Sequence, residues 1–189
     1  MKIKKILIVV SLFVIFEVVA IYVVNLKHKE ELNDLLNTTT HTIEDNFKTI
    51  SIAFDKIADL TFNGYLNKEP IKKLFKEGKR DELYDALLDD YYYLKKLRFH
   101  QVHFHSSDCK SFLRMHKRYK FDDDLSQSRY SVKYVNMFHK PILGGFETGM
   151  IIPGFRYVYP LFYKGEYIGS VENSFRWILL LDYLKTLMV

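Results

Sequence analysis

The chain has 189 residues, enough for one folded domain and an anchor, and 48% of them are hydrophobic, enough for a packed core. The formal net charge is +5, and the basic residues are spread among acidic ones rather than gathered in the concentrated patch typical of nucleic-acid binding, so no nucleic-acid partner is expected. The single cysteine, Cys109, excludes an intrachain disulfide and a multi-cysteine zinc site.

The N-terminal segment has the composition of a membrane anchor. Three lysines lie in residues 1–5, and an apolar run over residues 6–24 follows them. As a helix rising about 1.5 Å per residue, this run is about 28 Å long, which is enough to cross a bilayer core. It lacks the small residues that precede a signal-peptide cleavage site. We therefore expect an uncleaved transmembrane signal anchor, with residues 1–5 as a cytoplasmic tail.

Residues 25–97 are predicted to form a helical stalk and a further helical segment. The stretch over residues 26–62 contains neither Pro nor Gly, and its apolar residues recur at alternating spacings of four and three. The residues of this heptad seam are Ile43, Phe47, Ile50, Phe54 and Ile57. The seam meets either a second copy of the chain or a sheet of its own domain, and the sequence alone does not choose. Pro70 fits the first turn of a second helix, and a third is predicted over residues 81–97.

Residues 98–175 alternate between apolar and polar side chains in a way that predicts about five short strands, with one helix inserted over residues 126–138. The predicted strands cover residues 99–105, residues 111–116, a short segment with Phe146 and Glu147, residues 155–163 and residues 166–175. Pro160 within the fourth strand predicts an edge position or a bulge. Residues 176–189 are predicted to form an amphipathic helix that is too short to span a membrane.

This order of elements is that of a PAS-like or Cache-like sheet, and several blocks of residues extend the likeness. The blocks are Phe104-His105, Ser111-Phe112-Leu113-Arg114-Met115-His116, Asp123-Asp124-Leu125-Ser126, Lys140-Pro141, Gly145-Phe146-Glu147, Arg156-Tyr157-Val158-Tyr159-Pro160-Leu161 and Gly169-Ser170-Val171-Glu172. Together they resemble the double Cache sensor family, the extracytoplasmic sensors of bacterial diguanylate cyclases, chemoreceptors and histidine kinases. The resemblance covers about residues 98–175.

The resemblance implies an α+β fold, in which an N-terminal transmembrane helix and a long helix precede an antiparallel sheet. It also implies a single-pass protein of the bacterial inner membrane, with its sensor domain periplasmic or otherwise extracytoplasmic. The sequence departs from the family in lacking a second transmembrane helix, a second Cache lobe and an output module such as a cyclase or kinase. We therefore expect no enzyme activity, and a truncated receptor or a chain that works as a homodimer or beside a full-length receptor.

The predicted ligand site gathers cationic, aromatic and acidic side chains from separate strands and the inserted helix. Its residues are Arg114, His116, Arg129, Arg156, Tyr157, Tyr159 and Glu172. A guanidinium binds a carboxylate or phosphate through two hydrogen bonds, and aromatic neighbours strengthen those bonds by lowering the local dielectric, so a small anionic ligand is expected. The alternative is a set of internal ion pairs, Arg156 with Glu172 and Arg129 with Asp124.

Three histidines raise the question of a metal. His103 and His105 share one strand face and His116 lies on the adjacent predicted strand, an arrangement that can hold zinc or copper. Neither Cys nor a carboxylate at ligand spacing joins them, so hydrogen-bonded sheet histidines are the favoured interpretation and no cofactor is predicted. Three functions remain open: a ligand-binding sensor, an interaction partner of a receptor with no ligand of its own, and a metal-binding protein or enzyme.

Overall fold

The computed structural model describes residues 2–148, 153–176 and 178–187, and the chain divides into two units, Met1–Asn46 and Phe47–Val189. The described part of the first unit belongs to α1, Lys2–Thr61, which contains an apolar window of mean hydropathy 2.9 that is long enough to cross a membrane. Met1 of the expected tail lies outside the described residues, as do Trp177, Met188 and Val189 of the expected C-terminal helix.

A π-helical turn, Phe62–Leu66, ends the long helix, and three short helices follow it. They are α2 (Glu69–Lys76), α3 (Arg80–Ala86) and α4 (Leu88–Lys96). Pro70 lies in the first turn of α2, as expected. The single helix predicted over residues 81–97 is two helices instead, because the amide of buried Leu87 bonds to both Leu83 O and Tyr84 O and tightens the last turn of α3.

The sheet has five antiparallel strands in the order β2-β1-β5-β4-β3, which confirms the predicted α+β class. The strands are β1 (Gln101–Ser106), β2 (Ser111–Arg114), β3 (Ile142–Glu147), β4 (Gly154–Tyr163) and β5 (Glu166–Arg176). The inserted helix α5, Tyr130–Phe138, begins later than expected because Asp124 accepts a 2.8 Å bond from Ser126 N and holds a turn there. The last element is α6, Ile178–Leu187.

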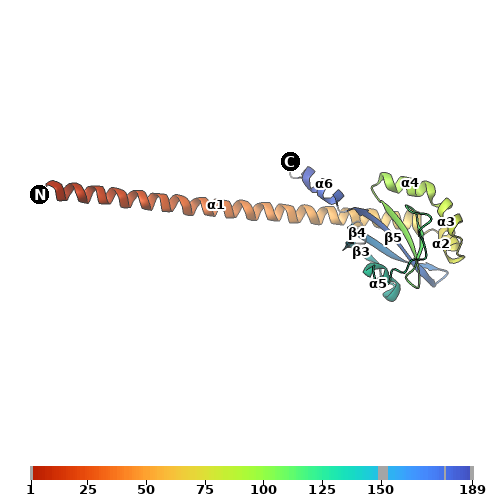
Figure 1. Ribbon diagram of the computed structural model, residues 1–189. Coiled ribbons are helices and arrows are strands. Elements are labelled where there is room, and N and C mark those ends of the chain that lie inside the picture. Colours follow the sequence, from red (N-terminus) through yellow and green to blue (C-terminus); the bar gives the residue numbers. More distant parts are fainter. Residues whose placement is uncertain (1, 149–152, 177, 188–189) are drawn as a thin grey trace. The chain divides into compact units, whose positions relative to one another are not determined.

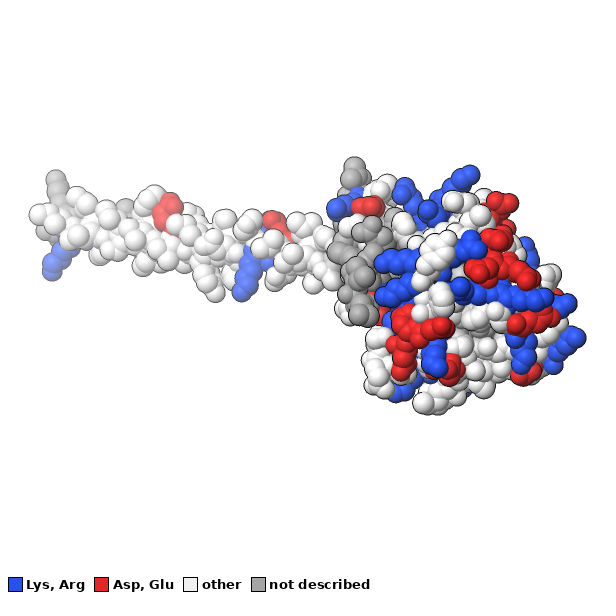
Figure 2. Space-filling view, turned by 45° about the vertical axis from the view of Figure 1, so that its right-hand side comes forward, with Lys and Arg blue, Asp and Glu red and all other residues white. Residues whose placement is uncertain are grey.

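The hydrophobic core lies on one face of the sheet, between the strands, the end of α1 and helices α2–α4. Of the predicted heptad seam, Ile50 and Phe54 are buried in this core with Ala58, whereas Ile43, Phe47 and Ile57 are more than a third exposed. The helix α5 packs against β3, β4 and β5 on the other face, apart from α2–α4 (Figure 1). Figure 2 shows basic and acidic side chains interspersed over the visible face of the folded unit.

A bulge in the last hairpin fixes which side chains share a face. The two-residue turn at Lys164 and Gly165 has positive φ at both positions, the conformation that suits a tight hairpin. The register then shifts by one residue between Leu161 and Phe162. As a result Arg156 lies opposite Ser174, whereas without the shift it would lie opposite Asn173. Arg156 and Glu172 therefore lie diagonally on the same face, which a regular two-residue hairpin would have prevented.

Pro160 lies next to this bulge, in a strand that is not an edge strand of the sheet. The pairing of β4 with β3 reaches only to Val158, opposite Ile142, the first residue of β3, so Pro160 lies beyond the end of that pairing. The predicted bulge is therefore present, and the missing amide donor of Pro160 interrupts no ladder between β4 and β3.

Replacing Gly169, which lies beside the bulge, tests the register of β5 against β1. Its φ is +134°, and a Cβ added there lies 2.3 Å from His105 O, so Gly169→Ala should reduce the free energy of unfolding by about 2–4 kcal/mol. Gly64→Ala is the matched control, because a Cβ there meets nothing within 4 Å. Urea unfolding of the full chain in detergent measures both, and equal stabilities of the two variants would contradict the assigned register.

Candidate ligand-binding site

The face of the sheet opposite the core carries a buried set of polar side chains. Strand alternation and the register between β1 and β5 place His103 beside Glu172 and His105 beside Ser170 on this face. Arg156 joins them from β4 through the bulge. Glu172 is 0% exposed and Arg156 is 3% exposed, so their charges must be balanced by near neighbours.

Arg156 and Glu172 form the ion pair that the sequence offered as the alternative to a ligand contact. Arg156 Nη1 donates to Glu172 Oε1 at 2.7 Å, and the same nitrogen lies 2.8 Å from Gln101 Oε1 and 3.3 Å from Ser174 Oγ. Gln101 was missed in the sequence, although it shares its strand parity with His103. The predicted pairing of Arg156 with Glu172 is confirmed.

Arg129, the residue immediately before α5, contacts the same carboxylate. Its Nη2 donates to Glu172 Oε2, and its Nε donates to Glu147 Oε2 at 3.1 Å. The expected pairing of Arg129 with Asp124 is therefore wrong, since Asp124 accepts the amide of Ser126 instead. Burial alone would raise the pKa of Glu172, but the guanidinium groups of Arg129 and Arg156 outweigh burial and lower it below its ordinary value.

Arg114 lies on the same face of the sheet but pairs with Asp123 rather than with Glu172. It forms a bidentate pair with Asp123, at 2.6 and 2.7 Å, and also donates to Lys120 O at 2.9 Å. The pair lowers the pKa of Asp123. Arg114 thus holds the loop between β2 and α5 in place, and its hydrogen bonds are made within that loop.

The two predicted tyrosines are not part of this cluster. Tyr157 and Tyr159 point to the core face, where their hydroxyl groups donate to Asp55 at 3.0 Å and to Asp59 at 2.8 Å, both on α1. Burial raises the pKa of both phenols. Alternation along β4 separates them from Arg156, so the structure does not bring the aromatic half of the predicted site to the arginines.

The buried histidines are hydrogen-bonded to serines, as the favoured interpretation expected. His103 Nε2 lies 2.8 Å from Ser111 Oγ, and His105 Nδ1 lies 3.1 Å from Ser170 Oγ. Their rings are 4.1 Å apart, and ligand atoms of the two rings and of Glu172 lie within 4.8 Å of one another. The expectation that no carboxylate joins the histidines is therefore wrong, because β5 brings Glu172 beside them, and His116 is not part of this group. Because Glu172 already binds two guanidinium groups, a further cation there would meet strong repulsion.

A cavity of about 280 Å³ opens beside Arg156. The described residues that line it are Tyr91, Lys95, His100, Gln101, His116, Pro153, Gly154, Arg156, Ser174 and Phe175. None of them is Asp or Glu, whereas Lys95 and Arg156 are cationic. His116 lines this cavity together with Arg156, and Lys95 is a lining residue that the sequence did not reveal. The cavity combines an apolar wall with convergent polar groups, as small-molecule sites do.

An antiparallel sheet with a helical core on one face and buried polar side chains on the other is the architecture of a PAS-like or Cache-like domain. A family model described as "Double sensory domain of two-component sensor kinase" (dCache_3) matches residues 60–178, more than half of the chain. The chain belongs to this double Cache family. The match is to a sensory rather than a catalytic domain, and no curated protein matches the sequence.

Solved structures with the same fold include three sensory proteins. The sensor domain of the V. cholerae histidine kinase DctB has a TM-score of 0.63 and 13% identity, over 80% of this chain and 60% of that one. An extracellular ligand binding receptor from Desulfohalobium retbaense has a TM-score of 0.56 and 15% identity, over 77% and 25%. A domain of a sensory box/GGDEF family protein from Vibrio parahaemolyticus has a TM-score of 0.54 and 12% identity, over 76% of this chain and 59% of that one. The chain thus spans less than two thirds of each of these structures.

The buried histidines predict a stability that falls in mild acid. Burial is the main cause that lowers the pKa of His105, to about 3, and that lowers the pKa of His103 well below its ordinary value. The unfolded chain therefore binds protons below about pH 6.5 that the folded chain does not. Stability is complete above that pH and should decline by about 1.4 kcal/mol per pH unit for each histidine as the pH falls toward 3.

Urea unfolding of the full chain in detergent at pH 7.5, 6.5 and 5.5 measures this slope. His105→Asn should reduce the slope, and His28→Asn, a change at an exposed position of α1, should leave it unchanged. A stability that is flat over this range in the parent chain would show that these imidazoles are protonated in the folded protein.

Proposed function

We propose that the chain is a single-pass, membrane-anchored sensor domain of a signal-transduction receptor, and that it binds a small anionic ligand on the extracytoplasmic side. The observation that carries this proposal is the cavity beside Arg156, whose described lining contains Lys95 and two histidines but no acid. A cationic hollow with little water around its donors binds a carboxylate more strongly than an exposed patch does.

The membrane position rests on the N-terminal segment and on the family. We assign residues 1–5 to a cytoplasmic tail, residues 6–24 to the membrane, residues 25–97 to the helical stalk and segment, residues 98–175 to the sensor sheet and residues 176–189 to a C-terminal helix. The apolar window of α1 has the length and composition of a membrane span. The relatives described as a histidine kinase sensor domain and as an extracellular ligand binding receptor support the same placement.

The predicted site residues take different parts in this proposal. Arg156 and His116 line the cavity and are assigned to ligand binding, together with Lys95, Gln101 and Ser174. Arg129 and Glu172 hold Arg156 in position through their shared ion pairs. Arg114, Tyr157 and Tyr159 are assigned supporting parts only, because each bonds to groups outside the cavity lining.

A route from the cavity to the long helix runs through the sheet itself. Tyr157 follows Arg156 in β4 and bonds to Asp55, and Asn173 follows Glu172 in β5 and donates to Ala58 O at 3.3 Å. A ligand that shifts β4 or β5 on one face thereby shifts partners of α1 on the other. We propose that the signal is a small displacement of this helix, as in other receptors that couple a binding site to a packed helix.

A second candidate function is favoured by exposed apolar residues on α1. Leu36, Ile43 and Phe47 are 56%, 40% and 42% exposed, and their spacing is that of a heptad seam. A chain that pairs through this seam with a second copy, or with a full-length receptor, needs no ligand of its own. The oligomeric state of the detergent-solubilised chain, measured beside ligand binding, separates this function from the sensor.

The ligand test uses the full chain in detergent and follows its midpoint of thermal unfolding. The probes are short mono- and dicarboxylates, amino acids and the corresponding neutral amides. An anion present at roughly 100 times its Kd should raise the midpoint by about 5–10 °C, because it binds only the folded state. The matching amides should have little effect, since they lack the charge that Arg156 and Lys95 recognise.

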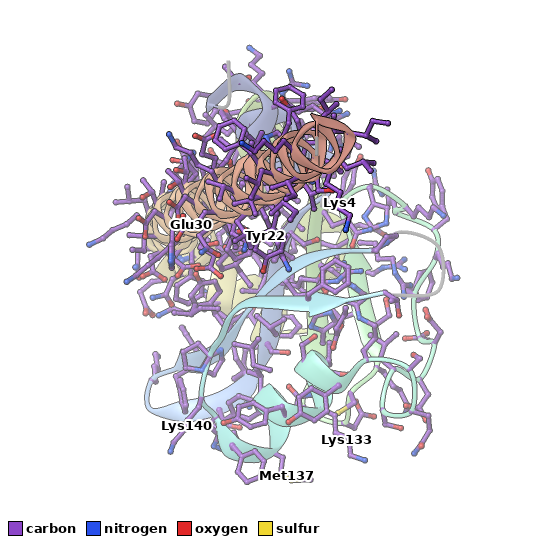
Figure 3. All side chains as sticks on the ribbon, turned by 90° about the vertical axis from the view of Figure 1, so that its left-hand side faces the viewer. Lys4, Tyr22, Glu30, Lys133, Met137 and Lys140 are labelled. Carbon is purple, nitrogen blue, oxygen red and sulfur yellow. The ribbon has the colours of Figure 1, made fainter. Side chains whose placement is uncertain are left out.

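Lys95→Met should weaken binding of that anion about threefold to tenfold, as expected for one exposed charge partner. Lys133→Met is the matched control, because this lysine is exposed on α5, where Figure 3 labels it, and is not among the residues that line the cavity. A chain that responds to none of these anions, or whose response is the same in both variants, would sink the sensor proposal. A stable dimer without any response would leave the pairing function.

A further inference from the structure

Glu147, the last residue of β3, accepts a hydrogen bond on each of its carboxylate oxygens. Its Oε2 accepts the 3.1 Å bond from Arg129 Nε, and its Oε1 accepts a 2.6 Å bond from the backbone amide of Ser131. The same Oε2 lies 4.0 Å from Arg156 Nε. Each oxygen of Glu147 thus receives its own N–H donor, with two guanidinium groups within reach.

These donors form an anion site that does not depend on which carboxylate fills it. The Ser131 amide lies in the first turn of α5, a nine-residue helix, where backbone amides have no partner within the helix and the helix dipole favours negative charge. Ser131 is 2% exposed, and its hydroxyl has no hydrogen-bond partner among the described residues. A polar group thus remains unsatisfied at the start of α5 while Glu147 occupies the amide.

Glu147 is less tightly packed than Glu172, the other carboxylate that Arg129 contacts. Its side chain is 16% exposed, against 0% for Glu172, and it lies on the edge strand β3. The pairing of β3 with β4 is irregular between Ile142 and Gly145, and Phe146 beside Glu147 is 56% exposed. Displacing Glu147 thus disturbs little packing, whereas displacing Glu172 would leave buried charges unbalanced.

The site adjoins the cavity through Gly154 and Arg156. Gly154 lies directly opposite Glu147 in the pairing of β3 with β4, and both Gly154 and Arg156 line the cavity. An incoming carboxylate that replaces Glu147 also preserves the local charge balance, in which three guanidinium groups meet the carboxylates of Asp123, Glu147 and Glu172. An incoming cation or neutral molecule would not preserve it.

We propose that Glu147 is a built-in carboxylate ligand, which occupies the anion site of Arg129 and Ser131 until a carboxylate-bearing molecule from the cavity displaces it. This names the ligand class of the proposed sensor as a carboxylate and rests on that proposed function for the entry route. The anion site itself rests only on the contacts of Glu147.

The experiment empties the site and refills it with the smallest carboxylates. In Glu147→Ala, formate or acetate at tens of millimolar should raise the midpoint of thermal unfolding of the full chain in detergent by about 3–6 °C. The parent chain, in which Glu147 already fills the site, should change by less than a third of that amount. Glu166→Ala, which removes an exposed acid on β5, is the matched control and should behave as the parent chain does.

Sodium chloride at equal ionic strength and formamide serve as controls for a general salt or solvent effect. Removing Arg129 as well, in Glu147→Ala with Arg129→Met, should abolish the response to formate. If Glu147→Ala is unfolded without additive, the same site predicts that formate restores its near-ultraviolet circular dichroism. A response equal in Glu147→Ala, in Glu166→Ala and in sodium chloride, or a variant that stays unfolded in formate, would overturn the proposal.

The outcome is separable from that of the sensor proposal. A parent chain that responds to larger carboxylates while Glu147→Ala ignores formate keeps the sensor and overturns the built-in ligand. If Glu147→Ala responds to formate and the parent chain responds to no anion, the anion site is supported and the sensor proposal is contradicted.

Discussion

The buried carboxylate of Glu172 is the constraint on which the polar face of this sheet depends. A charge with no exposure is stable only where opposite charges and hydrogen bonds replace its water. Arg156 supplies one guanidinium from β4, and Arg129 supplies the other from the start of α5. The bulge at Leu161 and Phe162 is what brings Arg156 to this face, so a local irregularity of one hairpin decides the chemistry of the whole site.

The same strands serve two faces with opposite characters. On one face, β4 and β5 carry Arg156 and Glu172 and border a cavity with a cationic lining. On the other, the residues that follow them, Tyr157 and Asn173, bond to the end of α1 within the core. Strand alternation thus places the candidate binding surface and the contacts with the end of α1 on opposite faces of the same two strands.

The sequence predicted the elements better than it predicted their contacts. Alternation and turn residues were enough for the five strands, and the Arg156–Glu172 pair was foreseen as an alternative. The bulge shifts the register of the hairpin by one residue, and Gly169 packs closely against His105 O of β1, a tertiary contact that no local pattern reveals. The sequence does not reveal the contact of Arg129 with Glu147, because only folding brings these two residues together. Alternation along β4, in contrast, already places Tyr157 and Tyr159 on the face opposite Arg156, so their assignment to the arginine site is avoidable from the sequence.

The most direct test of the shared ion pair is a double-mutant cycle on Arg156 and Glu172, measured as free energies of unfolding of the full chain. Each single change to Met should cost about 3–5 kcal/mol, because it leaves the partner charge buried without compensation. The double variant should cost less than the sum, with a coupling of about 1–3 kcal/mol. Single changes that each cost less than about 0.5 kcal/mol and add without coupling would contradict the central place given to Glu172.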